Sequence, residues 1–184
     1  MPPRLHLLTN IAAFQLGWFA CVLGGAWQHA WAGSLIALAA ILLHLWMARH
    51  RIPEVKLLAF ALLIGVGWES LIVSLGLMRY SSGNFLHGVA PHWILALWPL
   101  FATTLNVSLT WLRGRPWLAA VFGAVGGPLA YWSGQRLGGV QIPDLLLGLG
   151  AQCLGWAVFM PLLVWLAARY NGFASPPHPD SGRV

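Results

Sequence analysis

Long apolar stretches separated by short polar breaks dominate this sequence. Residues 5–48 contain no Asp, Glu, Lys or Arg. A helix needs about 20 residues to cross a bilayer, so this stretch is long enough for two crossings and a turn. The turn is expected within residues 24–33, where Gln28 and His29 interrupt a segment of Gly, Ala and Trp. Further breaks predict six spans, at about 5–26, 30–48, 57–78, 92–112, 117–135 and 145–168.

The breaks between the later spans are short. Residues 49–56 form a charged, proline-containing break, and residues 113–116 read Arg-Gly-Arg-Pro. Short connections favour helices that pack side by side, so the sequence predicts an all-α, polytopic six-helix bundle. One transmembrane domain is expected over residues 1–169. Residues 170–184 contain Pro and Ser, and we expect them to form a disordered cytoplasmic tail.

The distribution of basic residues predicts how the bundle is oriented. Cytoplasmic loops accumulate Lys and Arg, and six spans would place the two termini on the same side. That side holds eight of the ten basic residues, which predicts cytoplasmic termini in a multi-pass membrane protein. The eight are Arg4, Arg49, Arg51, Lys56, Arg113, Arg115, Arg169 and Arg183, and the other two are Arg79 and Arg136.

Composition removes most other classes of protein. Of the 184 residues, 59% are hydrophobic and 8% are charged, whereas soluble domains carry about 25% charged residues. A soluble enzyme, a secreted disulfide module and a disordered chain are therefore excluded. The net charge of +6 does not indicate nucleic-acid binding, because the basic residues are scattered between apolar runs. Cys21 and Cys153 lie inside apolar runs and form no paired motif.

Glu69 is the carboxylate that lies deep in a predicted span, and it is the candidate catalytic residue. An acidic residue at a helix centre costs about 2.5–3.5 kcal/mol on insertion scales, so it normally faces the bundle interior. Two interpretations remain open. Glu69 either takes part in proton transfer or catalysis, or it is a protonated structural group that hydrogen-bonds an amide such as Gln15 or Gln152. Whether the chain is an enzyme also remains open.

Four amides accompany this carboxylate within the predicted spans. Gln15 and Gln152 are expected near the level of Glu69, whereas Asn10 and Asn106 are expected nearer the cytoplasmic face. The amides are candidates for a polar cluster or a substrate path. The simpler interpretation is that they join helices, since a hydrogen bond between membrane helices contributes about 0.6 kcal/mol.

Histidines do not suggest a metal or haem site. His6 and His44 fall near the cytoplasmic ends of their predicted spans. No His-x-x-x-His or Glu-x-x-His motif occurs, and no carboxylate is close to these histidines in sequence. We therefore expect neither a metal nor another cofactor, and interpret the histidines as interfacial anchors.

The fifth predicted span is rich in small residues. Gly123 and Gly127 are four residues apart, and Gly134 begins a second such pair with Gly138. Small residues at this spacing allow helices to approach closely. Pro128 is expected to kink or break the helix and to free backbone carbonyl groups.

Three segments resemble a known family. They are Phe14-Gln15-x-Gly17-Trp18-Phe19-x-Cys21, Trp93-Ile94 with Leu97-Trp98-x-x-Phe101-Ala102, and Gly126-Gly127-Pro128-Leu129-Ala130-Tyr131. Together they resemble domain-of-unknown-function family 2878, whose members are small bacterial inner-membrane proteins. The family has no established activity, so the resemblance implies no catalytic residues. Its genes often neighbour cyclopropane-fatty-acid-synthase-like genes, so the resemblance implies a link to acyl-chain or envelope-lipid chemistry.

Three functions remain open from the sequence. The favoured one is handling or modification of acyl chains, with membrane lipids as partners. The second is a non-catalytic scaffold that holds a membrane or peripheral lipid enzyme through basic cytoplasmic loops. The third is a small proton-coupled carrier in which Glu69 titrates. No nucleic-acid partner is expected.

Overall fold

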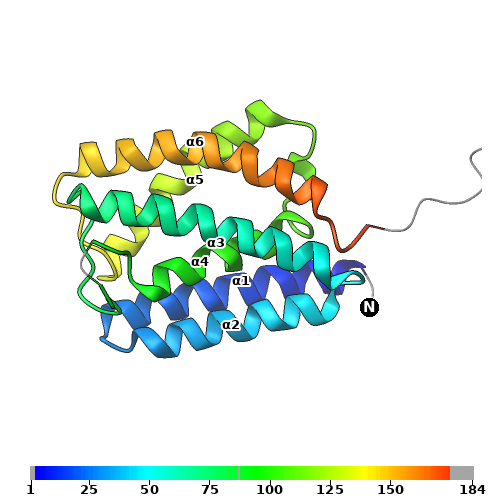
Figure 1. Ribbon diagram of the computed structural model, residues 1–184, viewed down its shortest axis with the longest axis horizontal. Helices are drawn as coiled ribbons and strands as arrows, with labels where there is room; N and C mark the ends of the chain where they lie inside the picture. Colours follow the sequence, from blue (N-terminus) through cyan, green and yellow to red (C-terminus); the bar gives the residue numbers. More distant parts are fainter. Residues whose placement is uncertain (1–2, 87, 175–184) are drawn as a thin grey trace, which may run out of the picture.

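Helices make up most of the computed structural model, which describes residues 3–86 and 88–174 (Figure 1). A single antiparallel bridge joins Arg79 to Gln141 between two loops. Six α-helices and one short 3₁₀-helix, η1, lie within the described residues. Their bounds are α1 Pro3–Ala26, α2 Ala30–Met47, α3 Arg51–Ser74, α4 His92–Leu105, η1 Thr110–Leu112, α5 Pro116–Arg136 and α6 Leu145–Arg169.

Helix α4 occupies the interior of the bundle. It packs against α1, α2 and α3, and it also contacts α6. Helices α1 and α2 form one close antiparallel pair, and α5 packs mainly against α6 (Figure 1). Helices α1 and α5 do not pack closely against each other. The interior position of α4 matters because this helix supplies the side chains between the two closely packed pairs.

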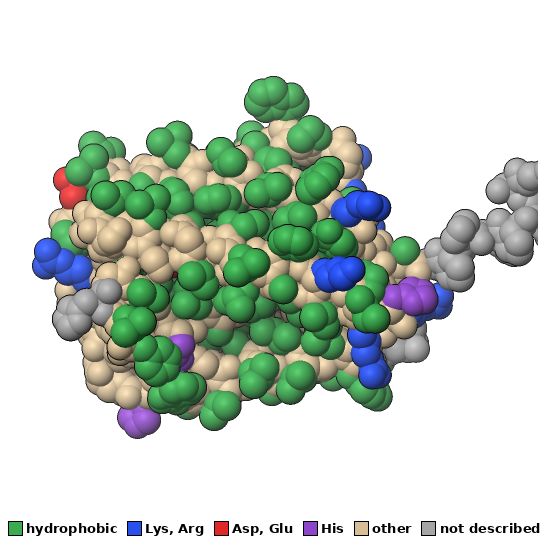
Figure 2. All heavy atoms as spheres, in the orientation of Figure 1, with side chains coloured by type: hydrophobic (Ala, Val, Ile, Leu, Met, Phe, Trp, Pro, Cys, Tyr) green, Lys and Arg blue, Asp and Glu red, His purple; other side chains and the backbone are tan. Residues whose placement is uncertain are grey.

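Four helices in the described part of the chain, α1, α2, α3 and α6, are long and apolar enough to cross a membrane. Helix α4 has only 14 residues. Large hydrophobic side chains are exposed along the long helices, as a lipid-facing surface requires. Figure 2 shows hydrophobic side chains across the middle of the visible face. Lys and Arg lie at its ends, most of them at the end where the chain begins.

Helix α3 differs from the predicted span. It begins at Arg51 and ends at Ser74, so residues 51–56 are helical rather than a charged loop. Pro53 falls in the first turn, where a helix tolerates a residue without a backbone N–H. Glu54, in the same turn, is favoured by the positive end of the helix dipole. The earlier end leaves Glu69 in the last two turns of the helix rather than at its centre.

Helix α4 ends earlier than predicted. The expected span over residues 92–112 is interrupted after Leu105 by a turn, and η1 follows. The hydroxyl groups of Thr103 and Thr104 donate to the carbonyl groups of Leu100 and Phe101. Such local hydrogen bonds compete with the regular backbone pattern, which favours a helix end at this point.

The expected break at Pro128 does not occur. Helix α5 runs without interruption from Pro116 to Arg136, with Pro128 inside it. Proline removes one donor from the backbone pattern, but neighbouring helices stabilise such positions in membrane proteins. Of the two outcomes predicted at Pro128, a kink or a break, the break does not occur.

Tryptophans pack against glycines at four contacts between helices. Each indole ring occupies the space beside a glycine, so a Cβ atom added to that glycine would collide with the ring. A planar ring against a bare backbone lets two helices pack closely without a gap. The pairs are Gly25 with Trp93, Gly65 with Trp98, Gly127 with Trp156, and Gly155 with Trp68.

Candidate functional site

Glu69 is fully buried and lies among donors from three other segments. Its Oε1 atom accepts a hydrogen bond from Trp98 Nε1 on α4, at 3.0 Å, and another from the Tyr131 hydroxyl on α5. Its Oε2 atom accepts from the Tyr80 hydroxyl in the loop after α3, at 3.5 Å. We call these four residues the Glu69 cluster. It joins α3, α4 and α5 through one carboxyl group.

Tyr80 reaches the carboxyl group because α3 ends at Ser74 and the chain then turns back. The pKa of Tyr80 lies well above its ordinary value, because its hydroxyl is buried and faces the Glu69 carboxyl group. The hydroxyl therefore keeps its proton and donates it to the hydrogen bond. This tyrosine was missed in the sequence because it lies outside every predicted span.

Neither predicted glutamine hydrogen-bonds Glu69. Gln152 is fully buried, accepts from Trp68 Nε1 at 3.0 Å, and has its Nε2 atom 3.6 Å from Met78 Sδ. That sulfur atom also accepts from the Tyr80 hydroxyl at 3.7 Å. Gln152 is therefore linked to the Glu69 cluster only through Met78. Gln15 lies on α1, on the far side of a cavity.

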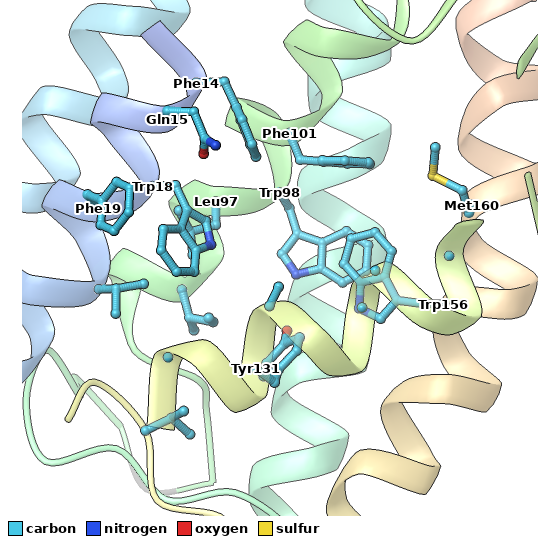
Figure 3. A pocket seen from close by; sticks show the side chains of 18 of the residues that line it. Phe14, Gln15, Trp18, Phe19, Leu97, Trp98, Phe101, Tyr131, Trp156 and Met160 are labelled. Carbon is cyan, nitrogen blue, oxygen red and sulfur yellow. The ribbon is translucent and has the colours of Figure 1, made fainter. Parts of the chain in front are cut away.

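This cavity has a volume of about 360 Å³ and lies between α1, α4, α5 and α6. Small-molecule sites typically measure about 300–1,000 Å³ and are mostly apolar. Figure 3 shows Trp98 and Trp156 lying over each other above Tyr131, and the centroids of the two indole rings are 5.0 Å apart. The aromatic lining residues are Phe14, Trp18, Phe19, Trp93, Trp98, Phe101, Phe122, Tyr131 and Trp156.

The Glu69 cluster supports one wall of this cavity. Trp98 and Tyr131 line it and also donate to Glu69, which itself is not part of the lining. The described residues of the lining include no Asp, Glu, Lys, Arg or His. The carboxyl group therefore orients two aromatic side chains without contributing a polar surface to the cavity.

The cavity opens between α1 and α5. Phe19 of α1 and Phe122 of α5 line the cavity and are also exposed on the outer surface of the chain, at 46% and 38% respectively. Leu97 and Phe101 of the interior helix α4 line its inner side. The cavity lining therefore runs from the exposed apolar surface to the interior helix α4.

The predicted glycines line the cavity from α5, the helix that also carries Tyr131. A Cβ atom at Gly123 would collide with the Trp156 carbonyl group, and one at Gly127 would lie 2.5 Å from the Trp156 side chain. These contacts explain why α5 and α6 pack so closely. Gly134 also lines the cavity, whereas Pro128 does not.

A second buried carboxylate, Glu54, lies at the other end of α3. Its Oε2 atom is 2.8 Å from His44 Nε2 on α2. Its Oε1 atom accepts from Asn106 Nδ2 at 2.6 Å and from the Gly172 backbone N–H at 2.7 Å. Arg113 donates to the Asn106 side chain. We call these five residues the Glu54 cluster.

This cluster corrects two expectations. His44 is 4% exposed and paired, so it is not an interfacial anchor. The segment after α6 was expected to be disordered, but Gly172 bonds Glu54, and Asn106 donates to the Tyr170 carbonyl group at 3.0 Å. The Phe173 ring lies 5.1 Å from the His44 ring. The rest of the predicted tail, residues 175–184, lies outside the described residues.

Asn10 lies beside the Glu54 cluster without joining it. Its Nδ2 atom donates to the Thr103 carbonyl group at 3.0 Å, and its Oδ1 atom accepts from Ser108 at 2.9 Å. It therefore ties α1 to the end of α4. Within residues 3–86 and 88–174, no group of three or more His, Cys, Asp and Glu side chains is placed to hold a metal ion.

Comparison with known protein families matches residues 7–162 to the family described as "Protein of unknown function (DUF2878)". The chain belongs to this family. The match covers the Glu69 cluster, the cavity and every helix up to most of α6. No curated protein and no solved structure matches the chain. DUF2878 membership confirms the resemblance read from the Trp- and Gly-containing segments and assigns no activity to the site.

Sequence reasoning found the carboxyl group of the Glu69 cluster but not its partners. Trp98 and Tyr131 were named only as residues that carry the family resemblance. In an apolar helix, a tryptophan or tyrosine gives no sign that it will hydrogen-bond a buried carboxyl group. Their positions relative to Glu69 depend on how three helices pack. The pairing of His44 with Glu54 could have been predicted from the sequence. His44 is three residues before the end of α2, and Glu54 is in the first turn of α3. A short turn between two helices brings such positions close together.

Proposed function

We propose that this DUF2878 protein is a multi-pass protein of the bacterial inner membrane that binds the hydrocarbon chain of a membrane lipid. The observation that carries this proposal is the aromatic cavity that opens between α1 and α5. Its mouth lies on the exposed apolar surface, where lipid chains surround a membrane protein. An acyl chain can enter it sideways without first leaving the bilayer.

The chemistry of the cavity supports a hydrocarbon occupant. Its lining is almost entirely aromatic and aliphatic, which is typical of sites for apolar ligands. A chain inside a bilayer is already in an apolar environment, so close packing against rigid rings must supply much of the affinity. The stacked Trp98 and Trp156 rings offer such a fixed surface.

The proposal includes six membrane spans within one domain over residues 1–169 and cytoplasmic termini. Helices α4 and α5 complete the bundle in this arrangement, because α4 is surrounded by other helices and needs little lipid-facing surface. The excess of Lys and Arg at one end supports the orientation. Reporter fusions after Lys56 and Arg115 are expected to read cytoplasmic, and a fusion at Gly83 is expected to read periplasmic. A periplasmic signal after Arg115 would contradict six spans.

Photo-crosslinking tests the lipid site directly. The purified protein is placed in bilayers that contain phosphatidylethanolamine with a diazirine in one acyl chain, and labelled residues are mapped by mass spectrometry. Lipid at the surface labels exposed side chains, whereas only a chain inside the cavity labels Leu97 and Phe101 on the interior helix α4. We expect both Leu97 and Phe101 to be labelled. Label confined to exposed residues would contradict the proposal.

A matched pair of variants controls this experiment. A Cβ atom at Gly126, which lines the cavity, meets no other atom within 4 Å, and the same holds for Gly67 on the exposed side of α3. Gly126→Leu therefore fills the cavity with little strain, and Gly67→Leu adds the same side chain elsewhere. We expect Gly126→Leu to abolish the label on Leu97 and Phe101, and Gly67→Leu to retain it.

A second candidate function is a proton-coupled carrier, which the contacts of Glu69 with two cavity-lining residues favour. A proton on Glu69 would alter its hydrogen bonds to Trp98 and Tyr131, and thereby the shape of the cavity wall. Proteoliposomes that take up protons only when a fatty-acyl ester is added as the transported substrate, and that lose this uptake in Glu69→Gln, would favour the carrier. Equal proton uptake with and without the added ester would oppose it.

A further inference from the structure

Gln15 is a polar side chain in the otherwise apolar lining of the cavity, and the contacts described above do not account for it. It lies near the middle of α1, twelve residues after Pro3, and it both lines the cavity and is exposed. Figure 3 shows its amide pointing into the cavity beside Phe14 and Trp18. It takes no part in the hydrogen bonds that tie Trp98 and Tyr131 to Glu69.

A carboxamide in this position needs a partner. It carries two donors and one acceptor, and an unpaired polar group in an apolar environment costs about 1–3 kcal/mol by protein mutational data. Water is scarce at the middle of a membrane-spanning helix. The occupant of the cavity is therefore the available source of a hydrogen-bonding group for Gln15.

The charge of that group is also constrained. Neither Lys, Arg nor His is found among the described residues that line the cavity. A phosphate or a free carboxylate entering it would leave its hydration shell without gaining a cation, which is strongly unfavourable. The Glu69 carboxyl group, which lies behind Trp98 and Tyr131, is itself acidic and offers no positive charge. An anionic group is therefore excluded from the cavity.

We infer that the cavity binds an uncharged lipid segment in which a hydrocarbon chain carries an ester or similar acceptor group, and that the Gln15 amide donates to that group. This inference rests on the proposed lipid-binding function and specifies the class of ligand. Apolar rings hold the chain, and Gln15 sets how far along the chain the polar linkage lies. Gln15 is a binding residue at the mouth, distinct from the Glu69 cluster at the inner wall.

Competition against the photoactivatable phosphatidylethanolamine tests the inference. The competitors are methyl hexadecanoate, nonadecane as a hydrocarbon with the same number of heavy atoms, and hexadecanesulfonate as a permanently anionic chain. In the wild-type protein we expect the ester to reduce labelling of Leu97 and Phe101 at concentrations on the order of fivefold lower than nonadecane, because one hydrogen bond contributes about 1 kcal/mol. The sulfonate is expected to compete least.

Gln15→Met keeps the length of the side chain and removes its donors. In this variant, we expect the ester to reduce labelling no more effectively than nonadecane does. The reduction caused by nonadecane should be the same as in the wild-type protein. Leu16→Met is the control, because Leu16 is 68% exposed and does not line the cavity. This control should retain the preference for the ester.

The outcomes separate the two proposals. If Leu97 and Phe101 are labelled but Gln15→Met affects the ester and nonadecane equally, the assignment of Gln15 is overturned while lipid binding stands. Competition by the sulfonate that equals competition by the ester would overturn the exclusion of anions. If neither residue is labelled in the wild-type protein, the lipid-binding function itself fails.

Discussion

Helix α3 carries two fully buried glutamates, Glu54 and Glu69, whose neighbours differ in kind. Glu54 faces a histidine, an amide and a backbone N–H, and these partners come from α2, from the segment after α4 and from the segment after α6. Glu69 faces an indole and two phenols. Trp98 and Tyr131 of the second set also line the cavity of about 360 Å³. The difference indicates that the Glu54 cluster holds segments of the chain together, whereas the Glu69 cluster positions aromatic rings beside that cavity.

Glu54→Leu is expected to cause the largest loss of stability. Removing the carboxyl group leaves His44, Asn106 and the Gly172 N–H without their acceptor, and breaking a buried pair typically costs about 3–5 kcal/mol. Denaturation of the purified protein in mixed micelles measures this free energy of unfolding. Molecules that remain folded should still be labelled at Leu97 and Phe101. Loss of that label without loss of stability would reverse the roles assigned to the two clusters.

Gly127→Leu is expected to have the next largest effect and to act on the cavity side alone. The new side chain displaces the Trp156 ring, and overpacking of this kind costs about 1–3 kcal/mol. Leu118→Ala, at a residue 40% exposed on the same helix, should change the free energy of unfolding much less. Proteolysis near residue 174 should be unchanged, since the Glu54 cluster is not touched. Equal unfolding free energies for the two variants would refute close packing of α5 on α6.

Glu69→Gln should lower the free energy of unfolding by only about 1 kcal/mol. A carboxamide oxygen in the place of Oε1 still accepts from both Trp98 and Tyr131, so only the hydrogen bond from Tyr80 to Oε2, of modest net value, is lost. Glu69→Leu removes the acceptor for both and should destabilise the protein further. Labelling of Phe101 by the photoactivatable lipid serves as the second measurement. If Glu69→Gln destabilises the protein as strongly as Glu54→Leu does, the comparison between the clusters is wrong.

Tyr80→Phe should give the smallest change, below about 1 kcal/mol. Its hydroxyl lies 3.5 Å from Glu69 Oε2, the longest contact of that cluster. Tyr131→Phe should cost more, because the Tyr131 hydroxyl is the group that joins α5 to Glu69. Unfolding measured side by side for the two variants ranks them. A larger effect at Tyr80 would place the main support of Glu69 in the loop rather than on α5.

The apolar runs predicted the helices well because each span depends mainly on its own residues. The bounds of α1 and α2 differ from expectation by at most two residues at either end. The runs did not show that α3 includes Glu54. Charged residues beside Pro53 are typical of a loop, but they are equally compatible with the first turn of a helix. The prediction for Glu69 named a buried carboxyl group, but its partners Trp98 and Tyr131 depend on packing between helices that are 29 and 62 residues away along the chain.

The hydrogen bond from Gly172 to Glu54 also bears on how the protein is made. The two residues are 118 positions apart, and a chain emerges from the ribosome at about 5–20 residues per second. During synthesis Glu54 therefore spends several seconds with His44, and then Asn106, as its partners before the segment after α6 supplies the Gly172 N–H. A protein truncated within α6 would keep the first two partners and lack the third.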